Sequence, residues 1–246
     1  MISLENVTKI FKKNRVIADV TVEFPKSGLS VVTGLSGSGK TALLRLLSGE
    51  LKPDYGRIVK RHRDLRAYYD EKAGSFSGLG KAEIHAMWRL LYPGFDEEKF
   101  RTLAGNDKAA AGIFSLSLVA ASNAEIMIFD EPLLGFDTEQ KSVFLNLFRE
   151  LAESGKTVII AVSEIAEFET VADRAVVLNE GSLVVAEEVG KLLSTHRLVP
   201  GATTISPDYT VVGPVFNERL IQTDENVGRE ATLKEIITGY INGSSS

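Results

Sequence analysis

The chain carries the string Gly34-Leu35-Ser36-Gly37-Ser38-Gly39-Lys40-Thr41 between the apolar run 29–33 and the leucine-rich stretch 40–48. The run is typical of a buried strand and the stretch of a buried helix, so the string predicts the turn that joins them. Glycines in such a turn let the backbone wrap around a polyphosphate, and the helix N-terminus adds a dipole that favours anions. We therefore expect nucleotide binding by these residues: Gly34, Ser36, Gly37, Ser38, Gly39, Lys40 and Thr41.

Two side chains at the end of this string have distinct roles in phosphate chemistry. Lys40 is expected to bind the β- and γ-phosphates, and the hydroxyl of Thr41 is expected to ligate the Mg²⁺ that bridges them. The alternative is a glycine-rich turn without function. The strand and the helix on either side make that the weaker interpretation.

A metal site of this kind needs a second ligand at the end of a neighbouring buried strand. The string Ile126-Met127-Ile128-Phe129-Asp130 supplies one, because ligands of open α/β sheets collect at the carboxyl ends of their strands. We expect Asp130 to hold Mg²⁺ and Glu131 to orient and deprotonate an attacking water. The alternative is an ordinary strand-ending turn, which would make the pairing with residues 34–41 accidental.

Strand and helix patterns alternate along the chain, which predicts an α/β fold with a mostly parallel sheet. Expected strands are residues 2–8, 16–24, 29–33, 56–60, 65–69, 126–129, 157–162, 175–178 and 183–186, and expected helices are residues 40–48, 81–92, 96–103, 107–121, 138–153 and 164–171. Prolines and glycines recur beyond residue 198, so we expect residues 1–197 to form one domain. Residues 198–246 are expected to form a small β-rich appendage with a helix at 233–240 and a disordered tail from Gly243.

Composition excludes several classes of protein. The chain has 246 residues, with 28 Lys and Arg against 33 Asp and Glu, and thus no basic surplus for binding nucleic acid. It contains no cysteine, which excludes disulfides, thiolate metal sites and a cysteine nucleophile. The charged start is unlike a secretory signal, and no stretch reaches the roughly 20 apolar residues of a membrane span. We expect a cytoplasmic protein that another subunit would hold at a membrane.

The two motifs together resemble the ATP-binding subunit of an ABC transporter, and the resemblance covers about residues 1–195. It implies a P-loop NTPase fold of the ABC ATPase type, with a mostly parallel core sheet, an antiparallel β edge and a shortened helical subdomain at about residues 72–121. Phe11 stands where the family has an aromatic that stacks on adenine, and the alternative is an ordinary core residue at a strand end. The resemblance implies ATP and Mg²⁺ as cofactors.

The same resemblance implies partners. ABC subunits hydrolyse ATP between two chains, which implies a second ABC ATPase subunit, identical or different. It also implies a membrane-spanning permease subunit that would hold the pair on the inner face of the cell membrane. Residues 91–96 look like a segment of the bacterial exporter branch of the family, which serves antibiotic and peptide-antibiotic systems.

Three features of the family are altered in this sequence. The signature, which faces the partner's γ-phosphate, falls on residues 106–110, although residues 103–106 look more like it. In the first alignment Asp107 adds a negative charge, and Ala109 adds a Cβ where glycine allows close approach. The switch histidine falls on Ser163, which is too short to reach a γ-phosphate and carries no charge. The glutamine of the Q-loop falls on Glu71.

Two functions remain open from the sequence. The first is the ATP-binding subunit of an ABC-type export system that hydrolyses Mg-ATP slowly, which the presence of Glu131 favours. The second is a regulatory or structural ATP-binding subunit with little or no hydrolysis, which the three altered features favour. A small-molecule kinase would need an arginine-rich lid, and residues 56–103 contain only scattered arginines. Three histidines, His62, His85 and His196, lie near no motif, and we expect them at surface or helix positions.

Overall fold

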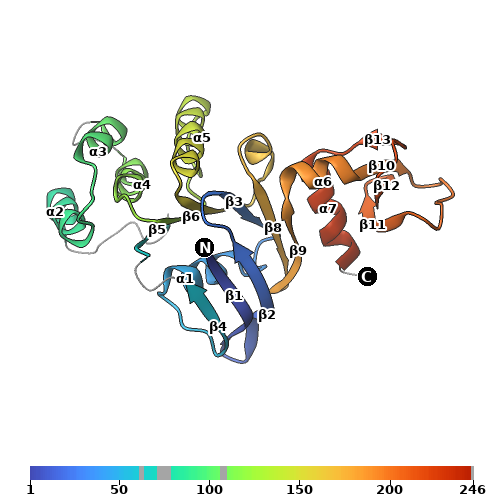
Figure 1. Cartoon of the computed structure of the whole chain (residues 1–246), viewed down its shortest axis with the longest axis horizontal. Coiled ribbons are helices and arrows are strands. Elements are labelled where there is room, and N and C mark those ends of the chain that lie inside the picture. The colour runs from blue at the N-terminus through green and yellow to red at the C-terminus, as the bar shows by residue number, and fades with distance from the viewer. Residues whose placement is uncertain (61–63, 71–78, 106–109, 245–246) are drawn as a thin grey trace.

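The computed structural model describes residues 1–60, 64–70, 79–105 and 110–244, and the strands of these residues form three sheets (Figure 1). The largest sheet has six strands in the order β5-β6-β7-β3-β8-β9. Its neighbours are parallel except β8 and β9, which form an antiparallel pair. The bounds are Gly28–Thr33 for β3, Arg66–Asp70 for β5, Ile126–Asp130 for β6, Thr157–Ala161 for β7, Arg174–Asn179 for β8 and Ser182–Glu188 for β9. The prediction of a mostly parallel α/β sheet is confirmed.

Strand β6 shows why the central strands are continuous apolar runs. Met127 and Phe129 belong to one hydrophobic cluster, whereas Ile126 and Ile128 belong to a second cluster. Successive side chains of a strand point to opposite faces, so a strand that is covered on both faces is apolar at every position. The large sheet is therefore buried between two layers.

Helix α1 (Lys40–Ser48) provides much of the layer on one face. Its four buried leucines share a hydrophobic cluster with residues of β6 and of a second, antiparallel sheet, whose order is β2-β1-β4. The strands of this sheet are β1 (Ile2–Phe11), β2 (Asn14–Phe24) and β4 (Tyr55–Lys60). The predicted antiparallel edge is confirmed, and α1 lies between the two sheets.

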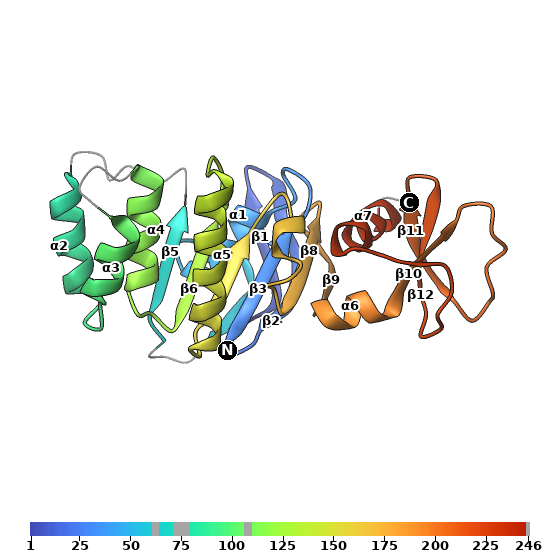
Figure 2. The same cartoon turned by 90° about the horizontal axis from the view of Figure 1, so that it is seen from above.

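The other face carries the remaining helices of the first two thirds of the chain. Helix α5 (Thr138–Glu153) packs on the sheet through Phe144, Leu147, Phe148 and Leu151, in the three- and four-residue spacing of an amphipathic helix. Helices α2 (Lys81–Leu91), α3 (Glu97–Ala104) and α4 (Ala111–Ala121) gather at one end of the molecule (Figure 2). These three helices form the helical part that the resemblance implied.

The C-terminal elements lie at the opposite end of the molecule (Figure 2). Four strands form an antiparallel sheet in the order β11-β12-β10-β13, next to the helices α6 and α7. The bounds are Val189–Thr195 for α6, His196–Pro200 for β10, Thr210–Val215 for β11, Glu218–Gln222 for β12, Arg229–Glu230 for β13 and Leu233–Ser244 for α7. Leu198 and Leu233 share a hydrophobic cluster with Val177 of the large sheet, so the two ends have a common core. The division of the chain into two domains stays a prediction, and its boundary falls inside β10.

Two local predictions are wrong. The helix predicted at residues 164–171 is only the 3₁₀ turn η1 (Ala166–Phe168). Ile165 and Phe168 are buried three residues apart, which is the period of a 3₁₀ turn, and the acidic side chains around them bind other elements. Gly243 and Ser244, predicted as disordered, form the end of α7. No helix within the described residues is long and apolar enough to cross a membrane.

Candidate functional site

Residues 34–39 form a loop between the carboxyl end of β3 and the start of α1. The φ angles of Gly34 and Gly39 are 148° and 103°. A Cβ on Gly34 would lie 2.1 Å from the carbonyl oxygen of Leu178, and a Cβ on Gly39 would lie 2.5 Å from that of Val16. Both positions therefore require glycine, because neighbouring backbone fills the space and L side chains rarely adopt such φ angles.

The other residues of the loop divide into an exposed tip and a buried base. Ser36 and Gly37 are exposed, whereas Ser38 is buried and donates its backbone N–H to the carbonyl of Leu35 at 3.0 Å. The hydroxyl of Ser38 has no hydrogen-bond partner among the described residues. A buried polar atom without a partner costs free energy, and a phosphate oxygen at the loop would satisfy it.

Lys40 begins α1, and its side chain folds back into the loop. The ammonium donates hydrogen bonds to the carbonyl oxygens of Gly34 at 2.9 Å and of Leu35 at 3.3 Å. Burial lowers the pKa of Lys40, and the nearby carboxylates of Glu131 and Asp130 oppose that effect. The loop thus holds a cation at its base, close to the two carboxylates that the sequence predicted.

Asp130 ends β6 and lies beside Thr41 of α1. Burial is the main reason that the pKa of Asp130 is raised, and the charges of Asp70 and Glu131 add to it. A hydrogen bond with Thr41 and the charge of Lys40 act in the opposite direction. The two predicted metal ligands therefore meet in the structure, although they are far apart in the chain.

The donors at this point suit Mg²⁺. The cation prefers hard oxygen ligands and keeps several waters, with one or two protein ligands and substrate phosphates completing its shell. Thr41 offers a hydroxyl and Asp130 a carboxylate. No group of three or more His, Cys, Asp or Glu side chains in the described ranges could hold a metal ion by itself. The residues therefore fit a metal that arrives with a phosphate ligand.

Glu131 is held by three hydrogen bonds, one with the next strand of the sheet and two with the loop that follows that strand. Its backbone N–H donates to the carbonyl of Ala161 at 2.9 Å, and its φ is 48°, which is unusual for a residue with a side chain. Its carboxylate accepts two hydrogen bonds from Ser163, one from the backbone N–H at 3.2 Å and one from the hydroxyl. The sequence indicated Ser163 only as a replacement for histidine, and no signal in it pointed to the contact with Glu131.

A second pair that the sequence did not predict lies next to Asp130. Asp70 ends β5 and is the register partner of Asp130. Its carboxylate accepts a hydrogen bond from Arg45 at 2.8 Å, and the side chain of Asp70 is only 4% exposed. Arg45 follows Thr41 by one helical turn, so one face of α1 serves both carboxylates. The four-residue spacing of Thr41 and Arg45 was the signal in the sequence that could have indicated this pair.

Phe11 ends β1 and is 43% exposed. Its ring faces the ammonium of Lys9, which lies 5.5 Å from the ring centroid. The alternative of a core residue is therefore wrong. The stacking of Phe11 on adenine stays a prediction, and an exposed ring is what it requires.

Several predicted positions lie outside the described residues. They are Glu71 of the Q-loop, Asn106, Asp107, Lys108 and Ala109 of the signature, and His62. Ala110, the last signature residue, directly precedes α4 and accepts the N–H of Phe114 at 3.0 Å.

The other two histidines are structural. His85 lies on α2 as predicted and stacks on Phe100 with ring centroids 4.3 Å apart. His196 was expected at a surface or helix position, and this is wrong. It begins β10, is 1% exposed, and its ring nitrogens contact the carbonyl of Leu192 and the hydroxyl of Tyr240. Its contacts lie in α6 and in α7, and no local sequence pattern indicates the contact with Tyr240 of α7.

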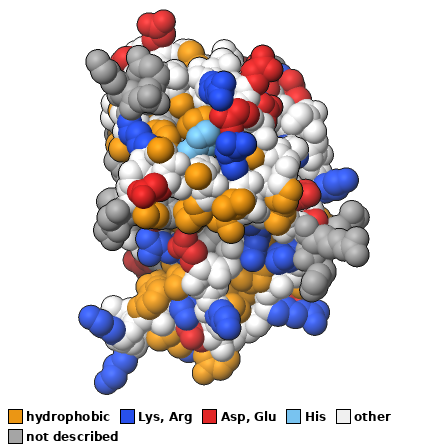
Figure 3. Space-filling model, turned by 90° about the vertical axis from the view of Figure 1, so that its left-hand side faces the viewer, with side chains coloured by type: hydrophobic (Ala, Val, Ile, Leu, Met, Phe, Trp, Pro, Cys, Tyr) orange, Lys and Arg blue, Asp and Glu red, His pale blue; other side chains and the backbone are white. Residues whose placement is uncertain are grey.

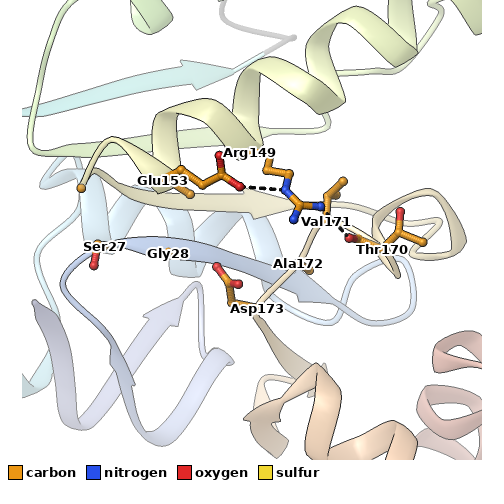
Figure 4. A pocket seen from close by; sticks show the side chains of 10 residues that line it. Ser27, Gly28, Arg149, Glu153, Thr170, Val171, Ala172 and Asp173 are labelled. Carbon is orange, nitrogen blue, oxygen red and sulfur yellow. Dashed lines mark hydrogen bonds and ion pairs between the residues drawn. The ribbon is translucent and has the colours of Figure 1, made fainter.

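A hollow at the opposite end of the parallel strands lacks the glycine loop and the carboxylates of the nucleotide site (Figure 4). Arg149 in this hollow binds Glu153 at 2.9 Å and the carbonyl of Thr170 at 3.4 Å. Asp173 accepts the backbone N–H of Leu29 at 2.7 Å. These charged groups of the hollow already have partners. The hollow also lies at the amino ends of the strands, away from the glycine loop.

Comparisons with known proteins agree with this geometry. Residues 17–134 match the family described as "ABC transporter". An ABC transporter ATP-binding protein of Methanocaldococcus jannaschii is 28% identical over 203 residues, which cover 74% of this chain and 76% of that protein. The arginine transport ATP-binding protein ArtM of Bacillus subtilis is 25% identical over 215 residues, covering 75% of this chain and 90% of ArtM.

Solved structures show the same fold. The dimeric post-hydrolysis state of an ATP-binding cassette bound to ADP and Pi superposes with a TM-score of 0.67 at 19% identity. That match covers 77% of this chain and 99% of the cassette. The glycine loop, the strand that ends in Asp130 and the fold thus point to one family. The chain is similar to the ATP-binding subunits of ABC transporters, and its residues 17–134 match that family.

Proposed function

We propose that this chain is the ATP-binding subunit of an ABC-type export system, which binds Mg-ATP and hydrolyses it slowly. The observation that supports this most is the convergence of Lys40, Thr41, Asp130 and Glu131 at the carboxyl ends of β3 and β6. All four side chains come from one chain. Binding of Mg-ATP therefore needs no second subunit, whereas hydrolysis in this family takes place between two.

Each residue has one task in the proposed reaction. The N–H groups of the loop and the ammonium of Lys40 bind the phosphates, and the exposed ring of Phe11 stacks on adenine. Thr41 and Asp130 would hold Mg²⁺, which supplies positive charge to the phosphate oxygens. Glu131 orients the attacking water and accepts its proton.

The low rate follows from the residues that replace the switch histidine and the signature. Ser163 donates its hydrogen bonds to Glu131 and has no charge to offer a γ-phosphate. The sequence at residues 106–110 would bring Asp107 toward the γ-phosphate of a partner. A negative charge there would weaken the contact across a dimer.

A regulatory or structural subunit with little or no hydrolysis is the second candidate. The observation that favours it is that both carboxylate oxygens of Glu131 already accept hydrogen bonds from Ser163. A carboxylate whose two oxygens are engaged in this way has fewer free acceptor positions for an attacking water.

The proposed location is the cytoplasmic face of the cell membrane, through a permease subunit and together with a second ATPase subunit. An apolar surface on the helical end of the molecule supports a protein partner (Figure 3). Leu79, Leu90 and Leu91 on or before α2 are 46%, 84% and 59% exposed. Leu90 and Leu91 are adjacent at the end of α2, and exposed apolar surface of this kind is typical of interaction sites.

The direction of transport rests on residues 91–96, which look like the exporter branch. Relatives named for import also match the chain, such as the hemin import protein HmuV of Thermobifida fusca. A deletion strain complemented with the wild type or with Lys40→Ala distinguishes export from import. Export predicts that cells with Lys40→Ala accumulate more of a panel of labelled peptide antibiotics. Lower accumulation than with the wild type contradicts export.

Binding of Mg-ATP is tested first, by calorimetry on the full chain. Lys40→Ala should remove most of the affinity, because Lys40 is the cation at the base of the loop, while Lys52→Ala on the exposed turn after α1 should not. Glu131→Gln should keep the affinity and lower turnover by roughly 10²–10⁴-fold. Equal affinity in the wild type and Lys40→Ala contradicts the proposed site, and unchanged turnover in Glu131→Gln favours the regulatory subunit.

A further inference from the structure

The segment 163–169, which joins β7 to β8, contacts Glu131 at one end and helix α7 at the other. Ser163 is the residue of this segment that holds the carboxylate of Glu131. The segment itself contains only the three-residue turn η1. Its position therefore depends on contacts with neighbouring elements rather than on a helix of its own.

Two acidic side chains join the segment to the start of α7. Glu164 accepts a hydrogen bond from the ammonium of Lys234 at 2.9 Å. Glu169 accepts a hydrogen bond from the backbone N–H of Leu233 at 2.8 Å. The first amides of a helix have no partner within the helix, so Glu169 supplies one that α7 lacks. The negative charge of Glu169 is also favourable at that helix end.

Apolar packing accompanies these polar contacts. Ile165 and Phe168 of the segment are 3% and 1% exposed, and Leu233 and Ile236 of α7 are fully buried. All four belong to one hydrophobic cluster. Close-packed interiors contain few voids, so a displacement of α7 would be transmitted to the segment.

The other end of α7 leads to the glycine loop. Asn179, the last residue of β8, donates its amide to the hydroxyl of Ser244 at 3.0 Å. Gly181, two residues later, donates its N–H to the carbonyl of Ser38 at 3.1 Å. Helix α7 is therefore connected to both sides of the nucleotide site, although it touches neither Lys40 nor Glu131 in any contact of the described residues.

We infer that α7 positions Glu131 for hydrolysis by holding the segment 163–169, with Ser163 as the positioning residue at the end of that segment. This inference rests on the proposed function, because it assigns α7 a role in the same hydrolysis. The C-terminal elements then control turnover and leave the binding of nucleotide unchanged.

Charge reversal at the exposed ion pair tests the connection without disturbing the core. Lys234 and Glu164 are 58% and 55% exposed, so the fold should tolerate Lys234→Glu. Repulsion from Glu164 should increase hydrogen exchange of the amides in 163–169, including the Ser163 amide that donates to Glu131, by about two- to tenfold. The double variant Glu164→Lys with Lys234→Glu, which swaps the two charges, should restore the protection of these amides from hydrogen exchange.

Turnover and affinity are then measured on the same full-length variants. Lys234→Glu should lower kcat by about two- to tenfold and leave the Kd for Mg-ATP within about twofold of the wild type. In a Ser163→Ala background Lys234→Glu should have little further effect, because both changes act through one contact. Lys191→Glu, which reverses the charge of the Lys191–Glu187 pair outside the segment, is the matched control.

Several results would overturn the inference. Unchanged exchange in 163–169, no recovery with the double reversal, or additive effects with Ser163→Ala would each show that α7 does not act through this segment. A loss of kcat equal to that of Lys191→Glu would show only a general charge effect. Failure of the proposed function is distinguishable, since the wild type would then either not bind Mg-ATP or bind it without turnover, whatever the hydrogen exchange of the segment.

Discussion

Replacement of Arg45 by alanine should destabilise the chain because it leaves the carboxylate of Asp70 buried without its cation. The two side chains form an ion pair of 2.8 Å, in which Asp70 is 4% exposed and Arg45 40% exposed. Breaking a fully buried pair costs roughly 3–5 kcal/mol. Water can reach the space that Arg45 leaves, so we expect a smaller loss of about 1–3 kcal/mol in the free energy of unfolding.

Urea unfolding followed by circular dichroism measures this loss, and the slope m should not change, because the surface exposed on unfolding stays the same. Arg149→Ala is the matched control. Arg149 and Glu153 are 56% and 64% exposed, and such surface pairs contribute about 0–1 kcal/mol. The double variant Arg45→Ala with Asp70→Asn should recover most of the stability, since an amide carries no charge that Arg45 would have to balance.

A loss in Arg45→Ala no larger than in Arg149→Ala would refute the assignment of a buried ion pair. So would a double variant with Asp70→Asn that is less stable than Arg45→Ala alone. Arg45→Ala should also weaken the Mg²⁺ dependence of nucleotide binding, because the charge of Asp70, no longer balanced by Arg45, would raise the pKa of Asp130 further.

Three further substitutions test the nucleotide site. Asp130→Asn should raise the midpoint of thermal unfolding at pH 7 without nucleotide, because burial raises the pKa of Asp130 and its ionised form therefore costs free energy in the folded chain. This gain in the unfolding midpoint should disappear as the pH falls through the raised pKa of Asp130, because the wild-type carboxyl is then also neutral. A gain that does not depend on pH would show that the charge of Asp130 is not its cause. Gly39→Ala should lower the affinity for Mg-ATP at least about tenfold by calorimetry, whereas Gly155→Ala, at a similar φ but with no atom within 4 Å of its Cβ, should not. Phe11→Ala should lower the affinity for ATP about fivefold or more and Phe11→Trp should keep it, since stacking on a base contributes roughly 1–3 kcal/mol. Equal affinities of the wild type and Phe11→Ala in a fluorescent competition assay would exclude stacking.

Local patterns were sufficient for the elements that build the nucleotide site. The apolar run before Gly34 and the leucines after Lys40 predicted a strand, a loop and a helix, and the structure has β3, the loop and α1 at those residues. The position of Asp130 followed from the four apolar residues before it. Such predictions succeed because periodicity and glycine geometry act within a few residues of the chain.

The segment 163–169 shows where local patterns fail. The sequence predicted a helix at residues 164–171, yet the structure has a single 3₁₀ turn there. Its acidic side chains bind Lys141, Lys234 and the N–H of Leu233 instead, and all three belong to other elements. Tertiary contacts of this kind outweigh the small propensity differences between helix and turn.

The sequence by itself determined the fold class, the glycine loop, the carboxylates at the end of β6 and the absence of cysteine chemistry. The glycine loop and the carboxylates depend on residues adjacent in the chain, whereas the fold class depends on the order of the strands and helices and the absence of cysteine chemistry depends on composition. Only the tertiary structure decided that Ser163 holds Glu131, that Arg45 pairs with Asp70 and that α7 contacts the segment 163–169. The physical reason is the strand order β5-β6-β7-β3-β8-β9, which brings together residues that are far apart in the chain and which no local periodicity specifies.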